Sequence, residues 1–312
     1  MPEVSQVHID VALTNVSVQY RNAAFIAEEI APPVSVKKQS GKYYVYDPER
    51  ESFRQTDDKR APGAEANEVG FALSTDSYNA EDHALEATIP DEERENADPM
   101  IQPEIDHTEF LMEKIGLNQE MEMANLILTD TALPGETLSG DAQWSDSDSD
   151  PVAAVEAKKA GIVEAIQIVP NTLVLPYEVY AKVRLHPKIV DRMKYSQVGG
   201  ATTGQLAELF DVERILVPRA VKNTAHPGHA ASIAYVWGKN AFLCYTPPRP
   251  ALKQTAFAYT FRWAAAPGSV NGLVVERWSE NRRKADMIRV QKYYDAKVIA
   301  AGAIYLWKAA VA

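Results

Sequence analysis

Residues 34–78 constrain this chain most, because they predict a long hairpin with too little apolar surface to fold alone. Residues 34–48 alternate and are rich in Tyr and Val, which is a strand pattern. A second extended segment covers 68–78, and the stretch 49–66 between the two is strongly polar. A two-stranded hairpin is marginal by itself in water. The pattern therefore predicts a hairpin that lies against another surface, as in an assembly.

The rest of the chain predicts an α+β fold with an extended N-terminal portion and a compact C-terminal portion. Apolar residues recur at helical spacing after Pro103 and predict one helix over about 104–129. At 1.5 Å per residue this helix would be roughly 38 Å long. Further helices are expected at 23–30, 152–161, 176–185, 189–195 and 205–210, and strands at 172–175, 214–217, 233–237, 241–245, 273–278, 287–293 and 297–306.

Charge is distributed unevenly along the sequence. The formal net charge is −11, which opposes strong binding to the phosphates of nucleic acid. Residues 38–98 hold sixteen Asp/Glu and seven Lys/Arg, whereas residues 277–297 hold seven Lys/Arg and three Asp/Glu. The two segments are either separate solvated surfaces or surfaces that meet between subunits. In the second case their charges would set the register of the contact and the choice of partner.

The composition excludes several classes of protein. No run of 18 apolar residues is present, so no membrane span is expected. The first residues lack the pattern of a secretory signal, and the single cysteine, Cys244, fits a reducing compartment such as the cytoplasm. Cys244 lies in an apolar run, which favours a core residue over a nucleophile.

Few residues are arranged as a catalytic or metal site. His226 and His229 flank a Pro-Gly turn and would bind zinc only with further ligands. The acidic run 146–150 lacks the central glycine and distal glutamate of a calcium loop, so it is expected to cap the next helix. The loop containing Gly199 and Gly200 is not a nucleotide-binding motif and is expected to be a flexible connection. No enzyme activity, cofactor or metal is predicted.

Six stretches, taken in order, carry a resemblance to a known family. They are 14–22 (TNVSVQYRN), 40–46 (SGKYYVY), 60–63 (RAPG), 170–175 (PNTLVL), 236–239 (VWGK) and 259–263 (YTFRW). In this order they resemble the major capsid proteins of tailed phages that have the Hong Kong 97 fold. The resemblance spans almost the whole chain and depends on the order of the six stretches. It implies an N-terminal arm at 1–37, an extended loop at 38–98, a peripheral domain with a spine helix at 99–149 and 271–297, and an axial domain at 150–270 and 298–312.

The resemblance implies a shell protein that assembles as hexamers and pentamers into an icosahedral head around double-stranded DNA. Its partners would be other copies of itself, a portal protein at one vertex, and scaffolding and decoration proteins. The scaffold is expected to be a separate protein, and DNA would be contacted weakly and non-specifically. Assembly would take place in the cytoplasm of the host bacterium. The residues expected at contacts between subunits are Asp57, Asp58, Lys59, Arg60, Gly199, Gly200, Arg277, Arg282, Arg283 and Lys284.

Two other functions stay open at this point. Encapsulin shells share the Hong Kong 97 fold, so the resemblance separates them poorly from phage capsids. A metal-dependent hydrolase that uses His226 and His229 belongs to a different class and would contain zinc in stoichiometric amount. Some members of the family link subunits covalently between a lysine and an asparagine. The sequence does not identify such a pair, and it does not assign Lys59 to one.

Overall fold

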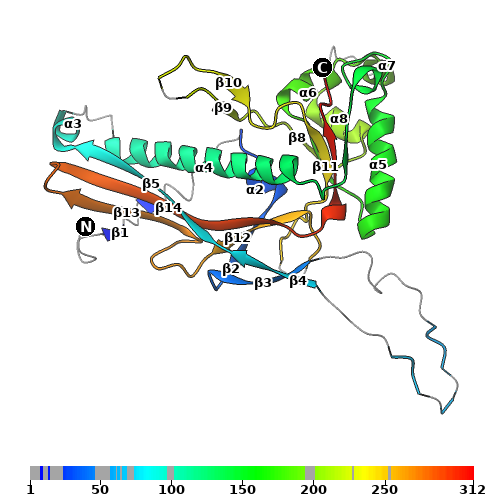
Figure 1. The fold of residues 1–312 in the computed structure, drawn as a ribbon, viewed down its shortest axis with the longest axis horizontal. Helices are drawn as coiled ribbons and strands as arrows, with labels where there is room; N and C mark the ends of the chain where they lie inside the picture. The colour runs from blue at the N-terminus through cyan, green and yellow to red at the C-terminus, as the bar shows by residue number, and fades with distance from the viewer. Residues whose placement is uncertain are drawn as a thin grey trace.

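The computed structural model describes residues 8–9, 13–14, 24–45, 57–60, 62–63, 65–68, 74–96, 102–193, 201–226, 228–251 and 254–312. One long helix crosses an elongated sheet, and a mixed α/β part lies at one end of that sheet (Figure 1). The described residues among 57–68 lie away from this body (Figure 1).

The elongated sheet has six strands and is organised around the 14-residue strand β14. Strand β14 pairs antiparallel with β13 and β5 over most of its length, and with β12 near its C-terminal end. Strand β2 adds to β12 in parallel, and β1 adds to β13. The bounds are β1 His8–Ile9, β2 Pro33–Val36, β5 Glu81–Pro90, β12 Ala258–Trp263, β13 Leu273–Glu280 and β14 Ala285–Val298.

Helix α4 (Pro103–Thr129) covers one face of this sheet and confirms the helix predicted for 104–129. Pro103 sits in the first turn, where its missing N–H costs no hydrogen bond. The N-terminal half of α4 buries an apolar cluster against the sheet. The buried members of that cluster are Leu13, Ile89, Leu111, Met112, Ile115, Leu273, Val275, Ile288 and Val290.

Strand β5 was not predicted from the sequence. Residues 85, 87 and 89 are apolar and face the helix side, whereas the residues between them are polar or small. The strand is held by β14, whose residues lie about 200 positions later, so the segment by itself resembled part of the polar loop. The short helix α3 (Asp91–Asn96) follows it directly.

The α/β part is built on a second, mixed sheet of five strands in the order β6-β15-β11-β7-β8. These strands are β6 Gly135–Thr137, β7 Thr172–Val174, β8 Arg214–Leu216, β11 Ala241–Cys244 and β15 Ile304–Lys308. Its helices are α5 Pro151–Ile166, α6 Tyr177–Val183, α7 Pro187–Arg192 and α8 Thr203–Leu209. Shorter elements are α2 Ala27–Ile30, the ribbon β9 Val221–Asn223 and β10 Ile233–Tyr235, and the 3₁₀ turns η3 Gly140–Ala142 and η5 Ala301–Ala303.

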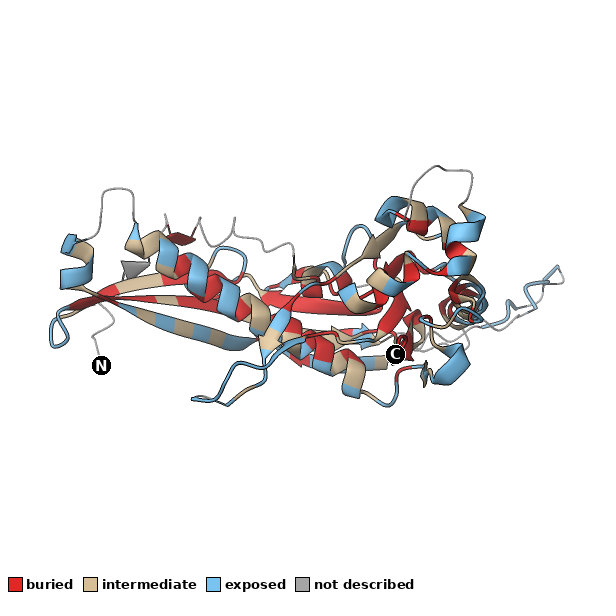
Figure 2. Cartoon of the chain, turned by 90° about the horizontal axis from the view of Figure 1, so that it is seen from above, coloured by how far each residue is buried: buried red, intermediate tan, exposed pale blue. Residues whose placement is uncertain are grey.

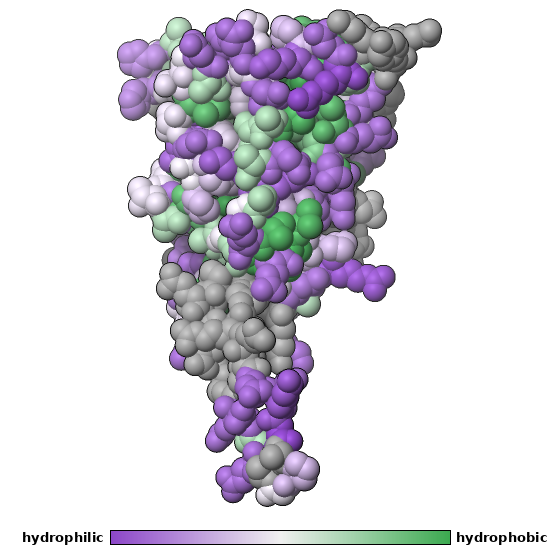
Figure 3. Space-filling view, turned by 90° about the vertical axis from the view of Figure 1, so that its right-hand side faces the viewer, coloured by the Kyte–Doolittle hydropathy of each residue, from purple (hydrophilic) through white to green (hydrophobic). Residues whose placement is uncertain are grey.

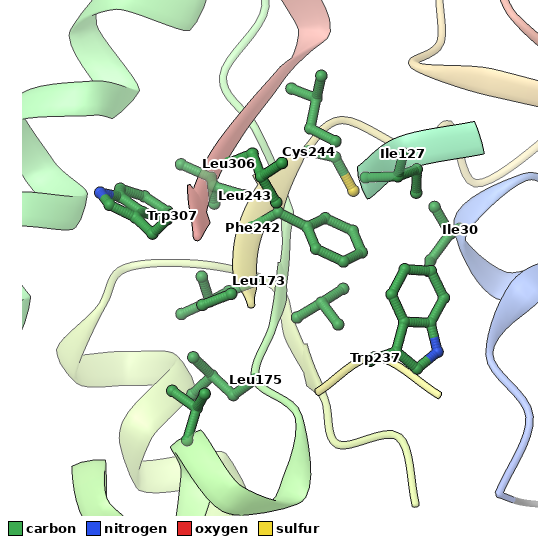
Figure 4. Packing of buried hydrophobic residues seen from close by; sticks show 14 of the residues in the cluster. Ile30, Ile127, Leu173, Leu175, Trp237, Phe242, Leu243, Cys244, Leu306 and Trp307 are labelled. Atoms are coloured by element: carbon green, nitrogen blue, oxygen red, sulfur yellow. The ribbon is translucent and has the colours of Figure 1, made fainter. Parts of the chain in front are cut away.

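The main core lies in the α/β part, where the central strands β7 and β11 are fully buried. Phe242 lies between Ile127 and Trp237 on one side of β11, and Trp307 lies on the other side (Figure 4). The rings of Trp237 and Phe242 are 5.4 Å apart between centroids. Figure 2 shows buried residues in this part and along the central strand of the elongated sheet. Cys244 belongs to this core, as its apolar flanks predicted.

Two predictions about where elements begin and end have different outcomes: the cap of α5 is confirmed, and the strand at 297–306 is wrong. Asp150 accepts the backbone N–H of Ala153 at 3.1 Å and caps α5, as predicted. The single strand predicted for 297–306 is wrong, because the chain passes there from one sheet to the other. Strand β14 ends at Val298, η5 makes the crossing, and β15 begins at Ile304.

Candidate subunit-contact surfaces

The base of the extended loop is a hairpin of β3 (Ser40–Val45) and β4 (Ser74–Asn79) that packs on the elongated sheet. Tyr43 and Tyr78 lie against Phe261, with ring centroids 5.1 and 4.6 Å away. Gly41 is needed beside Tyr78, because a Cβ at that position would lie 2.7 Å from the tyrosine oxygen. The predicted hairpin is therefore confirmed at its base, where β3 and β4 lie on the sheet of their own subunit. Residues 33–36 are not part of it, because β2 pairs with β12 instead.

Polar contacts fix this base further. The Tyr43 hydroxyl donates to Asp76 Oδ2 at 3.1 Å, and Asp295 Oδ2 accepts the backbone N–H of Asn79 at 2.8 Å. Burial, together with the neighbouring Asp76 carboxylate, raises the pKa of Tyr43. The hydroxyl therefore stays protonated and keeps donating over the whole neutral range. The hairpin of β3 and β4 is therefore held at a fixed position on the body.

The tip of the loop is exposed at each described residue, which are 57–60, 62–63 and 65–68. Two hydrogen bonds among these described residues are local: the Lys59 N–H donates to Asp57 Oδ1 at 3.1 Å, and the Asn67 side chain donates to the Asp57 carbonyl at 2.7 Å. The described part of the tip is mostly hydrophilic and lies away from the body (Figure 3). The structure thus brings Asp57, Asp58, Lys59 and Arg60 together on one protruding segment.

Arg282, Arg283 and Lys284 lie in the exposed turn between β13 and β14, at the opposite end of the long axis from the loop (Figure 1). Over the described ranges, none of these three side chains forms an ion pair. The acidic helix α3 adjoins them, since the Asp91 N–H donates to the Lys284 carbonyl at 3.0 Å. This end of the molecule therefore carries both signs of charge, not only the positive one.

Arg277 is engaged within its own subunit. Its guanidinium is 2.6 Å from Glu104 Oε1 and 2.8 Å from Asp286 Oδ2. Burial would raise the pKa of Asp286, but the hydrogen bonds and charge of Arg277 and the hydrogen bond of Ser279 outweigh burial and lower it. Arg289 is likewise paired, at 3.3 Å from both Glu86 and Glu276. Much of the basic character of 277–297 is thus neutralised by the same chain, and a role for Arg277 between subunits stays a prediction.

Gly199 and Gly200 lie outside the described residues. The chain is described again from residue 201, just before α8. Thr202 and Gln205 form a reciprocal capping box at the start of α8, in which each side chain accepts a backbone N–H of the other residue.

A buried carboxylate that was not predicted from the sequence joins the two parts of the molecule. Glu120 of α4 is fully buried and accepts N–H groups from Ile26 at 3.0 Å, Ala27 at 2.8 Å and the Trp237 indole at 2.5 Å. Burial raises the pKa of Glu120 to about 7, although the three donors counteract it. Glu120 therefore ties the N-terminal end of α2 and Trp237 of the α/β part to the long helix.

A second buried polar group lies between α2, α4 and the elongated sheet. Lys292 Nζ is 2.6 Å from Glu28 Oε1 and also donates to Gln119, while Arg262 pairs with the same Glu28 oxygen. Burial would raise the pKa of Glu28, but the charges of Lys292 and Arg262 outweigh it and lower the pKa to about 2. Gln119 and Glu120 interrupt the apolar face of α4, and polar residues on a buried helix face are the feature that indicates such contacts in a sequence.

The two histidines lie in a turn, as expected, where the His229 N–H donates to the His226 carbonyl at 3.1 Å. Within the described ranges, no group of three or more His, Cys, Asp or Glu side chains could hold a metal ion. Burial raises the pKa of the Cys244 thiol to about 12. No helix of the described residues is long and apolar enough to span a membrane.

Sequence comparison finds relatives over almost the full length of the chain. The major capsid protein of Burkholderia phage BcepMu is 29% identical over 308 residues, which cover 96% of this chain and 95% of that protein. The major capsid protein of Pseudomonas phage JBD67 is 31% identical over 261 residues, covering 82% of this chain and 83% of that protein. The chain belongs to the phage major capsid protein family. No model of a known protein family matches the sequence.

Solved structures agree with this assignment. A phage-related protein from Bordetella bronchiseptica matches with a TM-score of 0.77 and 27% identity, over 97% of each chain. The capsid protein of cyanophage P-SCSP1u matches with a TM-score of 0.60 at 10% identity, over 93% of this chain and 89% of that one. The fold is the Hong Kong 97-like capsid fold, as the sequence resemblance predicted.

Proposed function

We propose that this capsid protein assembles as hexamers and pentamers into the icosahedral head of a tailed phage and encloses double-stranded DNA. The observation that carries the proposal is the extended loop, which is anchored through Tyr43 and Tyr78 but has an exposed, polar tip. A two-stranded segment of this kind is marginal by itself in water, and the described residues of its tip are all exposed. It suits a protein whose loop rests on a neighbouring copy.

The predicted contact residues support this arrangement by their positions. The loop tip at 57–60 and the turn at 282–284 lie at opposite ends of the subunit (Figure 1). Because the two cannot meet within one chain, a contact between them requires two copies. Opposite charges at such a contact would fix its register more than its strength. The adjoining acidic helix α3 would restrict which part of the turn the loop tip approaches.

The division into domains is part of the same proposal. Residues 1–37 would form the arm, 38–98 the extended loop, 99–149 with 271–297 the peripheral domain, and 150–270 with 298–312 the axial domain. The segment with Gly199 and Gly200 would lie near the centre of each hexamer or pentamer. Residues 81–96 belong structurally to the elongated sheet and α3, so the free part of the loop is shorter than 38–98.

The other partners follow from the same role. The protein would be located in the virion after assembly in the cytoplasm of the host, with a portal protein at one vertex and with scaffolding or decoration proteins. The net charge of −11 would keep its contact with packaged DNA weak and non-specific. The encapsulin alternative shares the fold, but both relatives that cover most of the chain are phage capsid proteins.

The test is to express the full chain, alone and with a candidate scaffold, and to examine it by size exclusion and negative-stain electron microscopy. We expect closed shells, or rings of five and six subunits. A stable monomer under each condition would contradict the proposal.

Charge variants then test the loop contact. One variant reverses the acidic charges of the loop tip (Asp57→Lys with Asp58→Lys), and a second reverses the basic turn (Arg282→Glu with Arg283→Glu and Lys284→Glu). Each variant should reduce the assembled fraction by roughly tenfold, because like charges would be placed opposite each other. Combining the two sets of substitutions should restore most of the assembled fraction. Lys38→Glu, at an exposed position near the base of the loop, is the control and should assemble normally.

A further inference from the structure

The β9–β10 ribbon carries an unusual surface that its own subunit does not cover. Residues 214–275 contain seven Lys/Arg and no Asp or Glu, in a chain that has 43 acidic residues. The ribbon lies within this stretch and forms a two-stranded sheet of its own, with Val221 opposite Tyr235 and Ile233 opposite Asn223. It projects from the α/β part (Figure 1).

One face of the ribbon is apolar and aromatic. Ile233 is 62% exposed and Val221 is 44% exposed. Tyr235, on the same face, lies 5.9 Å from the ring of Tyr177, over which the guanidinium of Arg219 sits at 5.6 Å. Exposed aliphatic residues around a Tyr–Arg cluster are typical of a protein contact surface. Lys222 lies on the opposite face, because side chains alternate along a strand.

A complementary surface lies on the outer side of helix α4. Asp106, Glu109 and Glu113 flank Phe110, which is 54% exposed, and their spacing places all four side chains on one face. In the part of the chain that the structure describes, the three carboxylates form no ion pair. Lys114 lies over Phe110, with its Nζ 5.4 Å from the centre of the ring.

Helix stability alone does not account for these acidic residues. Like charges three and four positions apart destabilise a helix. Glu109 and Glu113 lie beyond the first turn, where the helix dipole no longer stabilises a negative charge. The outer face of α4, defined by Asp106, Glu109, Phe110 and Glu113, therefore has the composition of a contact surface for a basic and apolar partner.

We propose that the ribbon of one subunit docks on the outer face of α4 of a second copy. Ile233 and Val221 would cover Phe110, and Arg219 would meet Glu109 and Glu113. DNA is the less favoured occupant of the ribbon, because exposed Ile and Val side chains do not bind phosphates and because α4 would stay uncovered. Since two different surfaces meet, the contact is of the head-to-tail kind that closes rings. This inference rests on the proposed self-assembly.

Charge exchange across the proposed contact is the first test. Arg219→Glu and Glu109→Arg should each lower the assembled fraction of the full chain by roughly tenfold, and the double variant should recover to within about threefold of the unmodified protein. Lys222→Glu makes the same change of charge on the opposite face of the ribbon and should assemble normally. Single variants that assemble normally, or a double variant that is no better than either single variant, would overturn the inference.

Cross-linking provides a second test that does not depend on stability. Ile233→Cys and Phe110→Cys chains, mixed before assembly and oxidised afterwards, should give a disulfide-linked dimer that neither variant gives alone. Val169→Cys replaces Ile233→Cys in the control, because Val169 is 58% exposed but lies on neither surface. A dimer that is equally abundant in the control mixture would refute the contact.

The docking contact and the capsid function would be contradicted by different results. If closed shells form but the dimer and the charge rescue are absent, the docking is wrong and the capsid function stands. If no shells or rings form under any condition, the capsid function itself is wrong and the docking is wrong with it. Loss of DNA retention in the Arg219→Glu variant without loss of assembly would assign the ribbon to DNA and reject the docking.

Discussion

The α/β part and the elongated part of this capsid protein are stabilised in different ways. In the α/β part, the strands β7 and β11 are buried along their whole length, and Trp144, Trp237 and Trp307 are almost completely buried. In the elongated part, α4 covers one face of a sheet through a smaller apolar cluster, and charged side chains such as Lys292 and Arg262 are buried beside it. One part is a closed apolar core, and the other is a helix on a sheet with ionic contacts at the junction.

The difference indicates that the α/β part mainly stabilises the fold, whereas the elongated part mainly provides surfaces for assembly. A closed apolar core gives a stable unit regardless of what surrounds it. The elongated part leaves the loop tip, the basic turn and the outer face of α4 uncovered at its two ends and along its helix. We therefore expect changes in the α/β core to act mainly on folding, and changes on the elongated part to act mainly on assembly.

The largest effect on folding is expected at Phe242, which is fully buried. Phe242→Ala should lower the free energy of unfolding of the unassembled subunit by about 3–5 kcal/mol, because it removes a buried ring and leaves a cavity. Phe110→Ala, the same change at an exposed position, should cost less than about 0.5 kcal/mol. Denaturant unfolding measures the change in the free energy of unfolding for both variants. Equal changes would contradict the proposed difference between the two parts.

The buried Glu120 should make the junction between the parts sensitive to pH. Its pKa is raised from 4.5 to about 7. Ionisation of Glu120 therefore lowers the free energy of unfolding above pH 7, and this loss of stability disappears as the pH falls from 7 to 4.5. This group should contribute on the order of 3 kcal/mol to the difference in stability between pH 5 and pH 8. Glu120→Gln should remove that difference, whereas Glu109→Gln on the exposed face should keep it. An unchanged pH profile in Glu120→Gln would show that Glu120 does not titrate in this range.

The ionic contact at Lys292 should have a smaller effect. Lys292→Met keeps the apolar stem but removes the charge, and it should cost about 2 kcal/mol at pH 7, since Glu28 is partly exposed and keeps Arg262 as a partner. Lys38→Met at an exposed position should be close to neutral. Thermal unfolding of the unassembled subunit compares the two variants.

The same contact predicts a loss of stability in acid. Because the pKa of Glu28 is lowered to about 2, its contribution is complete above pH 4.5 and is lost as the pH falls from 4.5 toward 2. Glu28→Gln should flatten the stability profile in this window. A profile that stays as steep as in the unmodified protein would mean that other carboxylates dominate acid unfolding.

The smallest effect is expected at the base of the loop. Gly41→Ala places a Cβ 2.7 Å from the oxygen of Tyr78, whose ring stacks on Phe261 at 4.6 Å. The tyrosine has to shift, which should cost about 1–2 kcal/mol and loosen the loop. Hydrogen exchange of the Ser77–Asn79 amides should rise, and the variant Gly41→Ala with Tyr78→Phe should recover part of the loss. No change in exchange would mean that the loop base tolerates movement of Tyr78.

The parts of the fold that depend on local pattern were predictable. The apolar spacing after Pro103 predicted α4 to within one residue at each end, and Asp150 was correctly expected to cap α5. Strand β5 was missed because its partner β14 is distant in sequence and because its outward residues are polar. The break at η5 was missed because a change from one sheet to another leaves no local turn pattern that the sequence analysis detected.

The exposure and ion pairing of the candidate contact residues were predictable only in part. The exposed charges at 57–60 and 282–284 follow from their polar surroundings, and the structure places them on protruding segments. Arg277 is an arginine like Arg282 and Arg283 and lies in the same basic segment, yet it pairs with Glu104 and Asp286. Counting charges along the sequence could not separate these cases, because an ion pair depends on which strands and helices become neighbours.

The sequence by itself determined the class of fold, the long helix, the apolar core strands and the polar loop, since these follow from the periodicity and composition of short segments. Only the tertiary structure decided which charges are neutralised within the subunit and which stay exposed. Glu120 binds Trp237 and the backbone at Ile26 and Ala27, and Glu28 pairs with Lys292; the partners in each case come from distant segments. Their pairing depends on the packing of α2, α4, β12 and β14 against each other, which no short segment encodes.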